Sequence, residues 1–286
     1  MKVLKYILIT MIISMVAASC AGVKIPKPEL FQKSFTYLTT MAVVEICGPV
    51  KANENQKDGE KSCIRIGPKI YTASGFVVKH ENNKSFILTA GHFCGINRSR
   101  VIEDVVDAEE LTSYFKDVDK VNVSVNFKVL DGNNLTKTAI VKNIDPLLDT
   151  CIMQTDRINS PVLEFAEDSP EFGDELWNLA SPLGIVLPKT VPVLKGIYSG
   201  SVIINERKAY VVTDLPAIYG SSGSPLLNYE GKIVGMVYST NKAFNHVSFA
   251  VTLEDLREYV NNFFFNLGGK TTGTTTLEVI VPDFAK

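Results

Sequence analysis

The sequence lacks the excess of positive charge that a nucleic-acid-binding protein needs. Its 286 residues contain 29 lysine and arginine residues against 31 aspartate and glutamate residues, a formal net charge of -2. Because the two signs are mixed along the chain, no basic stripe is available to neutralise a phosphate backbone. We therefore expect no nucleic-acid partner.

The sequence also lacks the spacings that are typical of a structural metal site. It has five cysteines and three histidines, but no Cys-x-x-Cys and no His-x-x-x-His pattern. Tetrahedral zinc sites in proteins usually use such pairs of closely spaced ligands. The sequence therefore predicts neither a bound metal nor a cofactor.

The longest apolar run of the N-terminal region is short for a membrane span. Lys2 and Lys5 precede the apolar residues 6–18, whereas a spanning helix needs about 20 apolar residues. Basic residues, an apolar core and small residues in this order predict that residues 1–20 form an export signal peptide. The folded part is then expected outside the cytoplasm, in the periplasm, on a membrane or secreted.

The end of this signal leaves three alternatives open. Ala17-Ala18-Ser19-Cys20 resembles a bacterial lipoprotein box, in which the cysteine is lipidated, although a leucine usually stands where Ala17 does. Lipidation of Cys20 would attach the protein to a membrane. Ordinary cleavage would release it, and an uncleaved signal would leave it anchored.

The other four cysteines are an even number in a compartment that permits disulfide bonds. Cys47 and Cys63 flank the polar loop 51–61 and could be linked to one another. Four cysteines allow three pairings, and Cys94 and Cys151 could equally be buried free thiols. The sequence predicts disulfide bonding without deciding the pairs.

Hydrophobic residues make up 45% of the chain, enough to fill a core, and most lie in short runs broken by turn residues. Alternation and frequent Val, Ile, Phe and Tyr predict antiparallel strands. The expected strands of a first unit are 41–46, 70–78, 85–90, 121–129, 138–144 and 151–154. Those of a second unit are 175–180, 196–204, 209–213, 225–227, 232–238 and 248–251. Asn82-Asn83 and Glu230-Gly231 are expected to form hairpin turns.

Two segments have a helical period instead. Residues 102–115 are acidic and predict a surface insertion. After the last strand, Thr252 and Asp255 form a capping pair, and apolar residues follow at helical spacing. The predicted organisation is a signal peptide 1–20, a linker and entry segment 21–40, an N-terminal β unit 41–160, a C-terminal β unit 161–252, a helix 253–266 and a Gly/Thr-rich tail 267–286.

The stretch from Tyr219 to Pro225 has the composition of a tight turn that presents a serine. Ser222 lies between Gly220 and Gly223, so its hydroxyl can point outward while backbone N–H groups converge nearby. Such Gly-Ser runs are common in ordinary loops. The interpretation as a nucleophile therefore depends on partners elsewhere in the chain.

His92 and Asp149 are the candidate partners. His92 follows an apolar strand and a Thr-Ala-Gly turn, a place from which a side chain can reach a cleft. Asp149 precedes an apolar strand and can be buried beside a histidine, whereas Asp145 belongs to an Asp-Pro turn and is the less favoured alternative. His80 and His246 lie near a hairpin turn and in a polar loop, and we expect no catalytic role for them.

Taken in order, these pieces make the sequence similar to trypsin-like serine peptidases of the chymotrypsin fold, most of all to HtrA/Deg-type protease domains. The resemblance covers about residues 70 to 260. Its matching pieces are Ser74-Gly75-Phe76-Val77-Val78, Ile87-Leu88-Thr89-Ala90-Gly91-His92, Asp149-Thr150-Cys151-Ile152-Met153, Gly173-Asp174, Ser181-Pro182-Leu183-Gly184, Thr213-Asp214, Gly220-Ser221-Ser222-Gly223-Ser224-Pro225-Leu226, Gly231-Lys232-Ile233-Val234-Gly235 and Ser248-Phe249-Ala250-Val251.

The resemblance implies an all-β fold of two six-stranded antiparallel barrels with a C-terminal helix. It also implies an endopeptidase that acts on polypeptides through an acyl-enzyme, with Ser222 as nucleophile, His92 as general base and Asp149 orienting His92. The N–H groups of Gly220 and Ser222 would form the oxyanion hole. The alternative is a catalytically silent module of the same fold that binds peptides, although all three triad positions are intact.

The resemblance further implies where the substrate lies. The residues expected to bind it are Pro216, Ala217, Tyr219, Val237, Tyr238, Ser239, Thr240 and Val247. No acidic residue occupies the pocket floor, so cleavage after Lys or Arg is not expected. Val237 stands where glutamyl endopeptidases have a histidine, which leaves small or medium aliphatic residues as the predicted preference.

The sequence departs from the family pattern at the nucleophile turn. Ser221 stands where Asn or Asp is usual, and Ser224 where a second glycine is common. Whether Gly220 then points its N–H into the oxyanion hole is a question for the structure. We expect no PDZ domain and no zymogen cleavage, and trimers or other homo-oligomers are an open expectation from the family.

Overall fold

The computed structural model describes residues 34–51, 60–96, 98–105, 120–131, 133, 135–184, 191–241, 243 and 246–268. They form two closed barrels of six antiparallel strands each, which confirms the predicted fold class. The first barrel contains β1 (Phe35–Pro49), β2 (Lys61–Glu81), β3 (Lys84–Ala90), β4 (Lys120–Leu130), β5 (Thr136–Asp145) and β6 (Thr150–Asp156). Its strand order is β1-β2-β3-β6-β5-β4.

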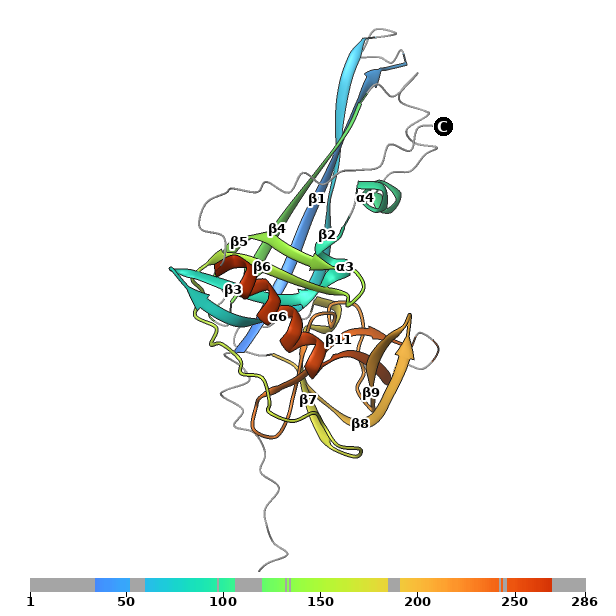
Figure 1. The fold of residues 1–286 in the computed structure, drawn as a ribbon. Helices are drawn as coiled ribbons and strands as arrows, with labels where there is room; N and C mark the ends of the chain where they lie inside the picture. The colour runs from blue at the N-terminus through green and yellow to red at the C-terminus, as the bar shows by residue number, and fades with distance from the viewer. Residues whose placement is uncertain are drawn as a thin grey trace, which may run out of the picture.

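The second barrel follows in the chain and lies against the first (Figure 1). It contains β7 (Glu175–Leu179), β8 (Val193–Ile204), β9 (Arg207–Thr213), β10 (Pro225–Leu227), β11 (Ile233–Thr240) and β12 (Val247–Thr252). Its strand order is β10-β11-β12-β9-β8-β7, and a short 3₁₀ helix η1 (Pro182–Gly184) follows β7. The turns of both predicted hairpins are present, and Asn82 and Asn83 have φ of 48° and 59°.

The first strand begins earlier than the sequence predicts. β1 includes Phe35–Thr40, which lie within the predicted linker and entry segment 21–40. Thr36 and Thr40 are fully buried on the same side as Leu38, so polar side chains occupy inward positions there. Because hydroxyls replace the expected apolar residues, the period-2 pattern is hidden in this stretch.

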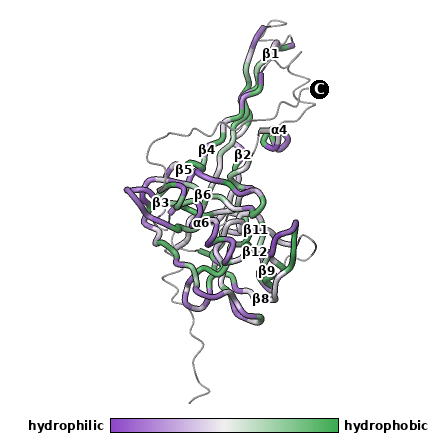
Figure 2. Tube along the Cα trace, in the orientation of Figure 1, coloured by the Kyte–Doolittle hydropathy of each residue, from purple (hydrophilic) through white to green (hydrophobic). Residues whose placement is uncertain are grey.

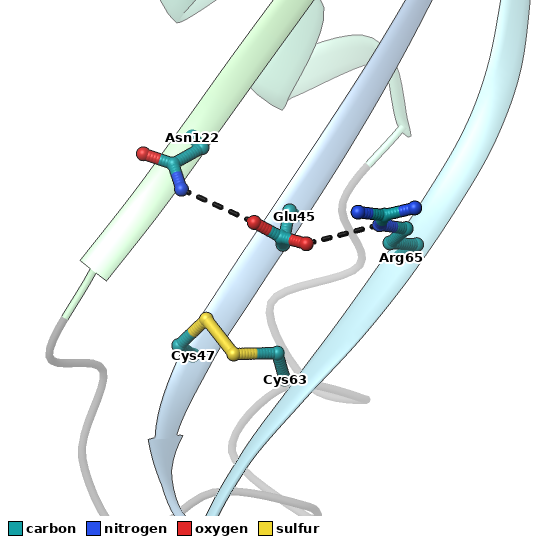
Figure 3. Close-up of a disulfide and its surroundings, with 5 residues drawn as sticks. All are labelled: Glu45, Cys47, Cys63, Arg65 and Asn122. Atoms are coloured by element: carbon teal, nitrogen blue, oxygen red, sulfur yellow. Dashed lines mark hydrogen bonds and ion pairs between the residues drawn. A yellow bond between two sulfur atoms is a disulfide. The ribbon is translucent and has the colours of Figure 1, made fainter.

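Strands β1, β2 and β4 continue past the first barrel as a long three-stranded arm (Figure 1). Hydrophobic and hydrophilic residues alternate along it (Figure 2), and the inward Val44 and Ile46 are buried with Val101. Near its end Cys47 and Cys63 pair across the two strands and form a disulfide (Figure 3). Two strands of the arm are thus joined covalently at a point far from the barrels.

Val101 belongs to helix α4 (Arg98–Val105), which packs against the arm. The sequence predicted a helix over 102–115, so the helix begins four residues earlier than expected. Residues 106–115 of that prediction lie outside the described residues. The start was missed because the buried Val101 is preceded by the charged and polar residues 98–100, which show no apolar period.

Helix α6 (Leu253–Gly268) crosses the junction of the two barrels (Figure 1). Its first turn is capped as predicted: the Asp255 N–H donates to Thr252 Oγ1 at 3.2 Å, and that hydroxyl donates to the Asp255 carboxylate at 2.8 Å. Leu256 and Tyr259 are buried in one cluster with residues of both barrels. The helix therefore helps to hold the barrels together.

The predicted signal peptide 1–20 with Cys20, and residues 269–286 of the predicted tail, lie outside the described residues. Within the described part, every helix is too short or too polar to cross a membrane.

Candidate active site

His92 and Asp149 form a closely held pair on the first barrel. His92 lies in the one-turn helix α3 (Gly91–Cys94), and Asp149 is the last turn residue before β6. His92 Nδ1 lies 2.7 Å from one oxygen of the Asp149 carboxylate, and the His92 backbone N–H donates to the other oxygen at 2.6 Å. The carboxylate therefore fixes both the ring and the backbone of His92.

The chain brings these residues together by a close approach of backbones. Strand β3 pairs with β6 up to Ala90 and Thr150, and the Gly91 N–H then donates to the Asp149 carbonyl at 2.8 Å. A Cβ on Gly91 would lie 2.9 Å from the Asp149 carbonyl carbon, so the contact requires glycine. Asp149 has φ of 52°, in the left-handed region that is strained for residues with a side chain.

Asp145, the alternative carboxylate, has a different task. Its Oδ1 accepts the N–H groups of Leu147 and Leu148 at 2.9 and 3.0 Å, which makes it the first residue of the turn before Asp149. His80 is occupied as well: its Nδ1 lies 2.9 Å from Ser85 Oγ and its Nε2 lies 3.0 Å from the Ser160 carbonyl. His246 is exposed in the loop before β12.

Ser222 lies in the turn between β9 and β10 of the second barrel. The Gly223 N–H donates to the Val237 carbonyl at 2.7 Å, and the Ser224 N–H donates to the Ser221 carbonyl at 3.1 Å. Gly220 and Gly223 have φ of +94° and +82°, values that glycine adopts without strain. The turn therefore forms with serine at 221 and 224, where the family pattern has other residues.

The two unusual serines are both buried and bonded. Ser221 Oγ accepts the Ile218 N–H at 3.3 Å, and Ser224 Oγ accepts from the Asn178 amide at 2.7 Å. These contacts tie the turn to its own first residues and to β7. A serine hydroxyl at each position is thus accommodated by a specific partner.

Ser74 of β2 connects this turn to the first barrel. Its hydroxyl donates to the Gly220 carbonyl at 2.8 Å and accepts the Ser181 N–H at 3.0 Å. The Ser74 backbone N–H donates to the Ser222 carbonyl at 2.9 Å. Ser74 is fully buried, so its hydroxyl is held away from water. The sequence singled out the Ser74 stretch as a motif but gave this residue no role.

The carbonyl groups of Tyr219 and Gly220 both accept hydrogen bonds from residues outside the Ser222 turn. The Leu183 N–H donates to Tyr219 O at 2.6 Å, and Ser74 holds Gly220 O. In a trans peptide the N–H points opposite to the carbonyl, so each engaged carbonyl also fixes the following N–H. Among the described residues no acceptor is bonded to the N–H groups of Gly220 and Ser222.

His92 and Ser222 line one cavity of about 510 Å³. Six of the residues predicted to bind substrate also line it: Ala217, Tyr219, Val237, Tyr238, Ser239 and Thr240. Pro216 and Val247, which were predicted with them, do not line it. Four lining residues were not predicted for this role: Arg100, Ile218, Ser221 and Asn241.

The missed lining residues come from two sources. Ile218, Ser221 and Asn241 are direct neighbours of predicted residues in the chain, so adjacency was an available signal. Arg100 comes from α4, in the insertion after His92, and nothing in its local sequence indicates that it faces the cavity. Burial, and after it the negative charge of Asp149, raise the pKa of the Tyr238 phenol above its ordinary value. No three metal-ligating side chains gather anywhere in the described part of the chain.

A family model described as a trypsin-like peptidase domain matches residues 73–236, more than half of the chain. A relative named as a probable periplasmic serine endoprotease, DegP-like, from Hahella chejuensis is 25% identical over 195 residues, which are 66% of this chain and 35% of the relative. The mitochondrial serine protease HTRA2 of Drosophila willistoni is 25% identical over 154 residues, 52% of this chain and 35% of the relative. The chain thus spans little more than a third of these relatives.

Solved structures with the same fold include the active form of a protease from M. tuberculosis, with a TM-score of 0.53 and 18% identity over 88% of this chain and 91% of that one. A serine endoprotease from Yersinia pestis has a TM-score of 0.50 and 18% identity over 78% of this chain and 63% of that one. At such identities these structures support the two-barrel fold alone. The family match, on a chain that pairs His92 with Asp149 opposite the Ser222 turn, places this protein in the trypsin-like peptidase domain family.

Proposed function

We propose that the protein is a serine endopeptidase in which Ser222, His92 and Asp149 act as a catalytic triad. One observation carries this proposal: His92 of the first barrel, which is bonded twice to the Asp149 carboxylate, lines one cavity with Ser222 of the second barrel. This is the juxtaposition of an oriented base and a nucleophile that acyl transfer requires.

In the proposed reaction, Ser222 Oγ attacks the carbonyl carbon of the scissile peptide while His92 Nε2 takes the hydroxyl proton. The resulting oxyanion accepts hydrogen bonds from the N–H groups of Gly220 and Ser222, which have no acceptor among the described residues. The C–N bond breaks as His92 returns the proton to the leaving amine. Water then attacks the acyl-enzyme by the same route and restores Ser222. Asp149 stays ionised and holds the imidazolium.

The substrate is proposed to be a polypeptide that pairs with the second half of β11. Ser239 and Thr240 of this strand pair with β12 on one side, while β10 pairs with β11 only through residues 233–236. The free side therefore offers backbone groups to an added strand. Ala217, Ile218 and Val237 give the cavity an apolar lining, which supports cleavage after small or medium aliphatic residues.

The proposed location is outside the cytoplasm. Two disulfides are present in the described residues, and such bonds persist in oxidising compartments. Some relatives are named as periplasmic endoproteases. Lipidation at Cys20 and assembly into homo-oligomers are finer proposals, to be tested by mass spectrometry of the membrane fraction and by the molar mass in solution.

The first prediction concerns the nucleophile. A fluorophosphonate probe should label the folded wild-type protein at Ser222, and Ser222→Ala should abolish labelling and lower the peptidase kcat by a factor of about 10⁴ to 10⁶. His92→Ala should lower kcat by nearly as much, because the triad acts as a unit. The matched control His80→Ala removes a histidine outside the cavity and should leave labelling intact.

Circular dichroism would show that each variant is folded. A folded wild-type protein that the probe does not label, and that cleaves no site in an unfolded proteome, would contradict the endopeptidase and favour the silent peptide-binding module. The same proteome digest reports the residue before each cut, and a preference for basic or acidic residues would contradict the aliphatic pocket.

A further inference from the structure

The second disulfide of the described chain lies beside the catalytic pair. Cys94 and Cys151 are bonded, with their Cα atoms 6.4 Å apart. Cys94 follows His92 by two residues, and Cys151 follows Asp149 by two residues. The disulfide, the short backbone segments 92–94 and 149–151, and the His92–Asp149 hydrogen bonds therefore form one small ring.

The segment that carries His92 depends on its neighbours for its position. Helix α3 is a single turn of four residues, and the His92 side chain is 43% exposed. A helix this short cannot hold its own conformation in water, so its position depends on contacts with neighbours. Those contacts are the Gly91 N–H bond to Asp149 O and the burial of Phe93 and Cys94 in the core of the first barrel.

The segment that carries Asp149 is strained. Asp149 adopts a left-handed φ of 52°, a conformation that persists only when the surrounding structure enforces it. Strand β6 begins at the next residue, and Cys151 within it is fully buried opposite Thr89. A covalent bond from Cys151 to α3 opposes relaxation of this turn away from His92.

We propose that the Cys94–Cys151 disulfide positions the catalytic pair, in that it holds α3 and the turn before β6 at the separation at which His92 Nδ1 and its backbone N–H both reach the Asp149 carboxylate. This inference rests on the proposed peptidase function. It assigns Cys94 and Cys151 a role in setting the rate of the reaction, in addition to any role in stability.

The other disulfide is a matched control within the same chain. Cys47–Cys63 joins two strands of the arm, where β1 pairs with β2 over residues 61–66, and none of its neighbours lines the cavity. Both bonds link segments of the first barrel and its arm. Only the Cys94–Cys151 bond lies two residues along the chain from His92 and from Asp149.

The test compares Cys94→Ala/Cys151→Ala with Cys47→Ala/Cys63→Ala, both folded by circular dichroism and assayed well below their unfolding temperatures. The Cys94/Cys151 variant should lose about 10- to 100-fold in kcat, because small misplacements of a base cost rates of this order, with KM within about twofold. The Cys47/Cys63 variant should keep its kcat. A Cys94/Cys151 variant with unchanged kcat would overturn the proposal.

A second readout does not depend on activity. A His92 Nδ1–H that donates to Asp149 should give a downfield proton resonance, assigned by its loss in His92→Ala. We expect this resonance to weaken or shift upfield in the Cys94/Cys151 variant and to be unchanged in the Cys47/Cys63 variant; an unchanged resonance in the former would count against positioning. If the wild-type protein is inactive, the proposed peptidase function fails, while the resonance still tests the bond.

Should the double-alanine variant not fold, Cys94→Ala/Cys151→Val restores apolar volume at the fully buried position of β6. The same two measurements then apply to it, with the same expected losses. Unaltered kcat and an unaltered resonance in this variant would overturn the proposal equally.

Discussion

At the scale of single residues, Ser74 links the nucleophile turn to the opposite barrel. Its hydroxyl bonds both the Gly220 carbonyl and the Ser181 N–H, and all of these atoms are shielded from water. Its backbone N–H also bonds the Ser222 carbonyl, so Ser74 fixes the peptide planes that follow Gly220 and Ser222, directly beside the two N–H groups of the proposed oxyanion hole. The geometry of the proposed oxyanion hole therefore depends on a residue that contacts no substrate.

We predict that Ser74→Ala lowers kcat by about 10- to 100-fold, since removal of a bond to a buried carbonyl costs about 1–3 kcal/mol. The affinity for a peptide boronate, which forms the tetrahedral adduct, should fall with kcat, while the affinity for a product peptide should not. Ser199→Ala, which removes a hydroxyl bonded to Thr213 on β8–β9, is the control and should change neither. Equal losses for boronate and product would argue against an effect on the oxyanion hole.

The sequence singles out the residues of the proposed triad, because their local settings and their order along the chain are both visible there, and the structure brings His92 to Asp149 and to one cavity with Ser222. The role of Ser74 could not be predicted from the sequence, since its bond to Gly220 joins residues 146 positions apart. Arg100 was missed for a related reason: its place at the cavity follows from how α4 packs on the arm, which no local pattern records.

At the scale of elements, α6 is the segment that contacts both barrels. Leu256 is fully buried in a cluster that includes Phe86 and Ile152 of the first barrel and Ile233 of the second. The ring of Phe264 packs edge-on against Phe86 with centroids 5.1 Å apart. The sequence predicted this helix well, because its N-terminal cap and the spacing of its apolar residues both indicate a helix. Its position across the junction of the two barrels could not be predicted, because it depends on long-range packing that periodicity does not show.

We predict that Leu256→Ala destabilises the protein by about 2–5 kcal/mol, the usual cost of truncating a buried leucine. Urea denaturation would measure this loss, and kcat assayed on the folded variant should be unchanged because α6 does not line the active-site cavity. The control is Phe265→Ala, whose side chain is 82% exposed on the same helix and should change stability by less than about 0.5 kcal/mol. Equal effects of the two substitutions would contradict the packing of α6.

At the scale of the whole molecule, His80 joins the first barrel to the segment that leads to the second. Its Nε2 bonds the carbonyl of Ser160 in that segment, and its Nδ1 bonds Ser85 Oγ, which also accepts the Ile158 N–H. Because the Ser160 carbonyl can only accept, Nε2 carries a proton, and in the neutral imidazole Nδ1 then accepts the proton of the Ser85 hydroxyl. Burial lowers the pKa of His80 below its ordinary value.

Because the folded-state pKa is the lower one, the unfolded chain binds more protons just below the ordinary histidine pKa of about 6.5. The stabilising contribution of neutral His80 is thus complete above this pH and is lost as the pH falls through the folded-state pKa. We predict that the free energy of unfolding of the wild type falls between pH 7 and 5, and that His80→Gln, which does not titrate, shows a smaller fall. Parallel curves for the two proteins in urea titrations would contradict this.

The stability that depends on the Asp156 carboxylate is lost in a different pH range from the stability that depends on His80. The hydrogen bond from Lys84 lowers the pKa of Asp156, so the stability associated with that pair is present above the ordinary aspartate pKa of about 3.9 and is lost only in stronger acid. The pH 7 to 5 interval therefore reports on His80 without interference from this pair.

The bond between Cys94 and Cys151 also bears on when the protein becomes active. Thiols stay reduced in the cytoplasm, so a newly made chain holds Asp149 near His92 by hydrogen bonds alone. If the disulfide positions this pair, the proposed peptidase reaches its full rate only in an oxidising compartment, and the reduced chain is about 10- to 100-fold slower. Formation of this bond would then act as a redox-dependent restraint on the proposed peptidase, which is slowest where its thiols are reduced.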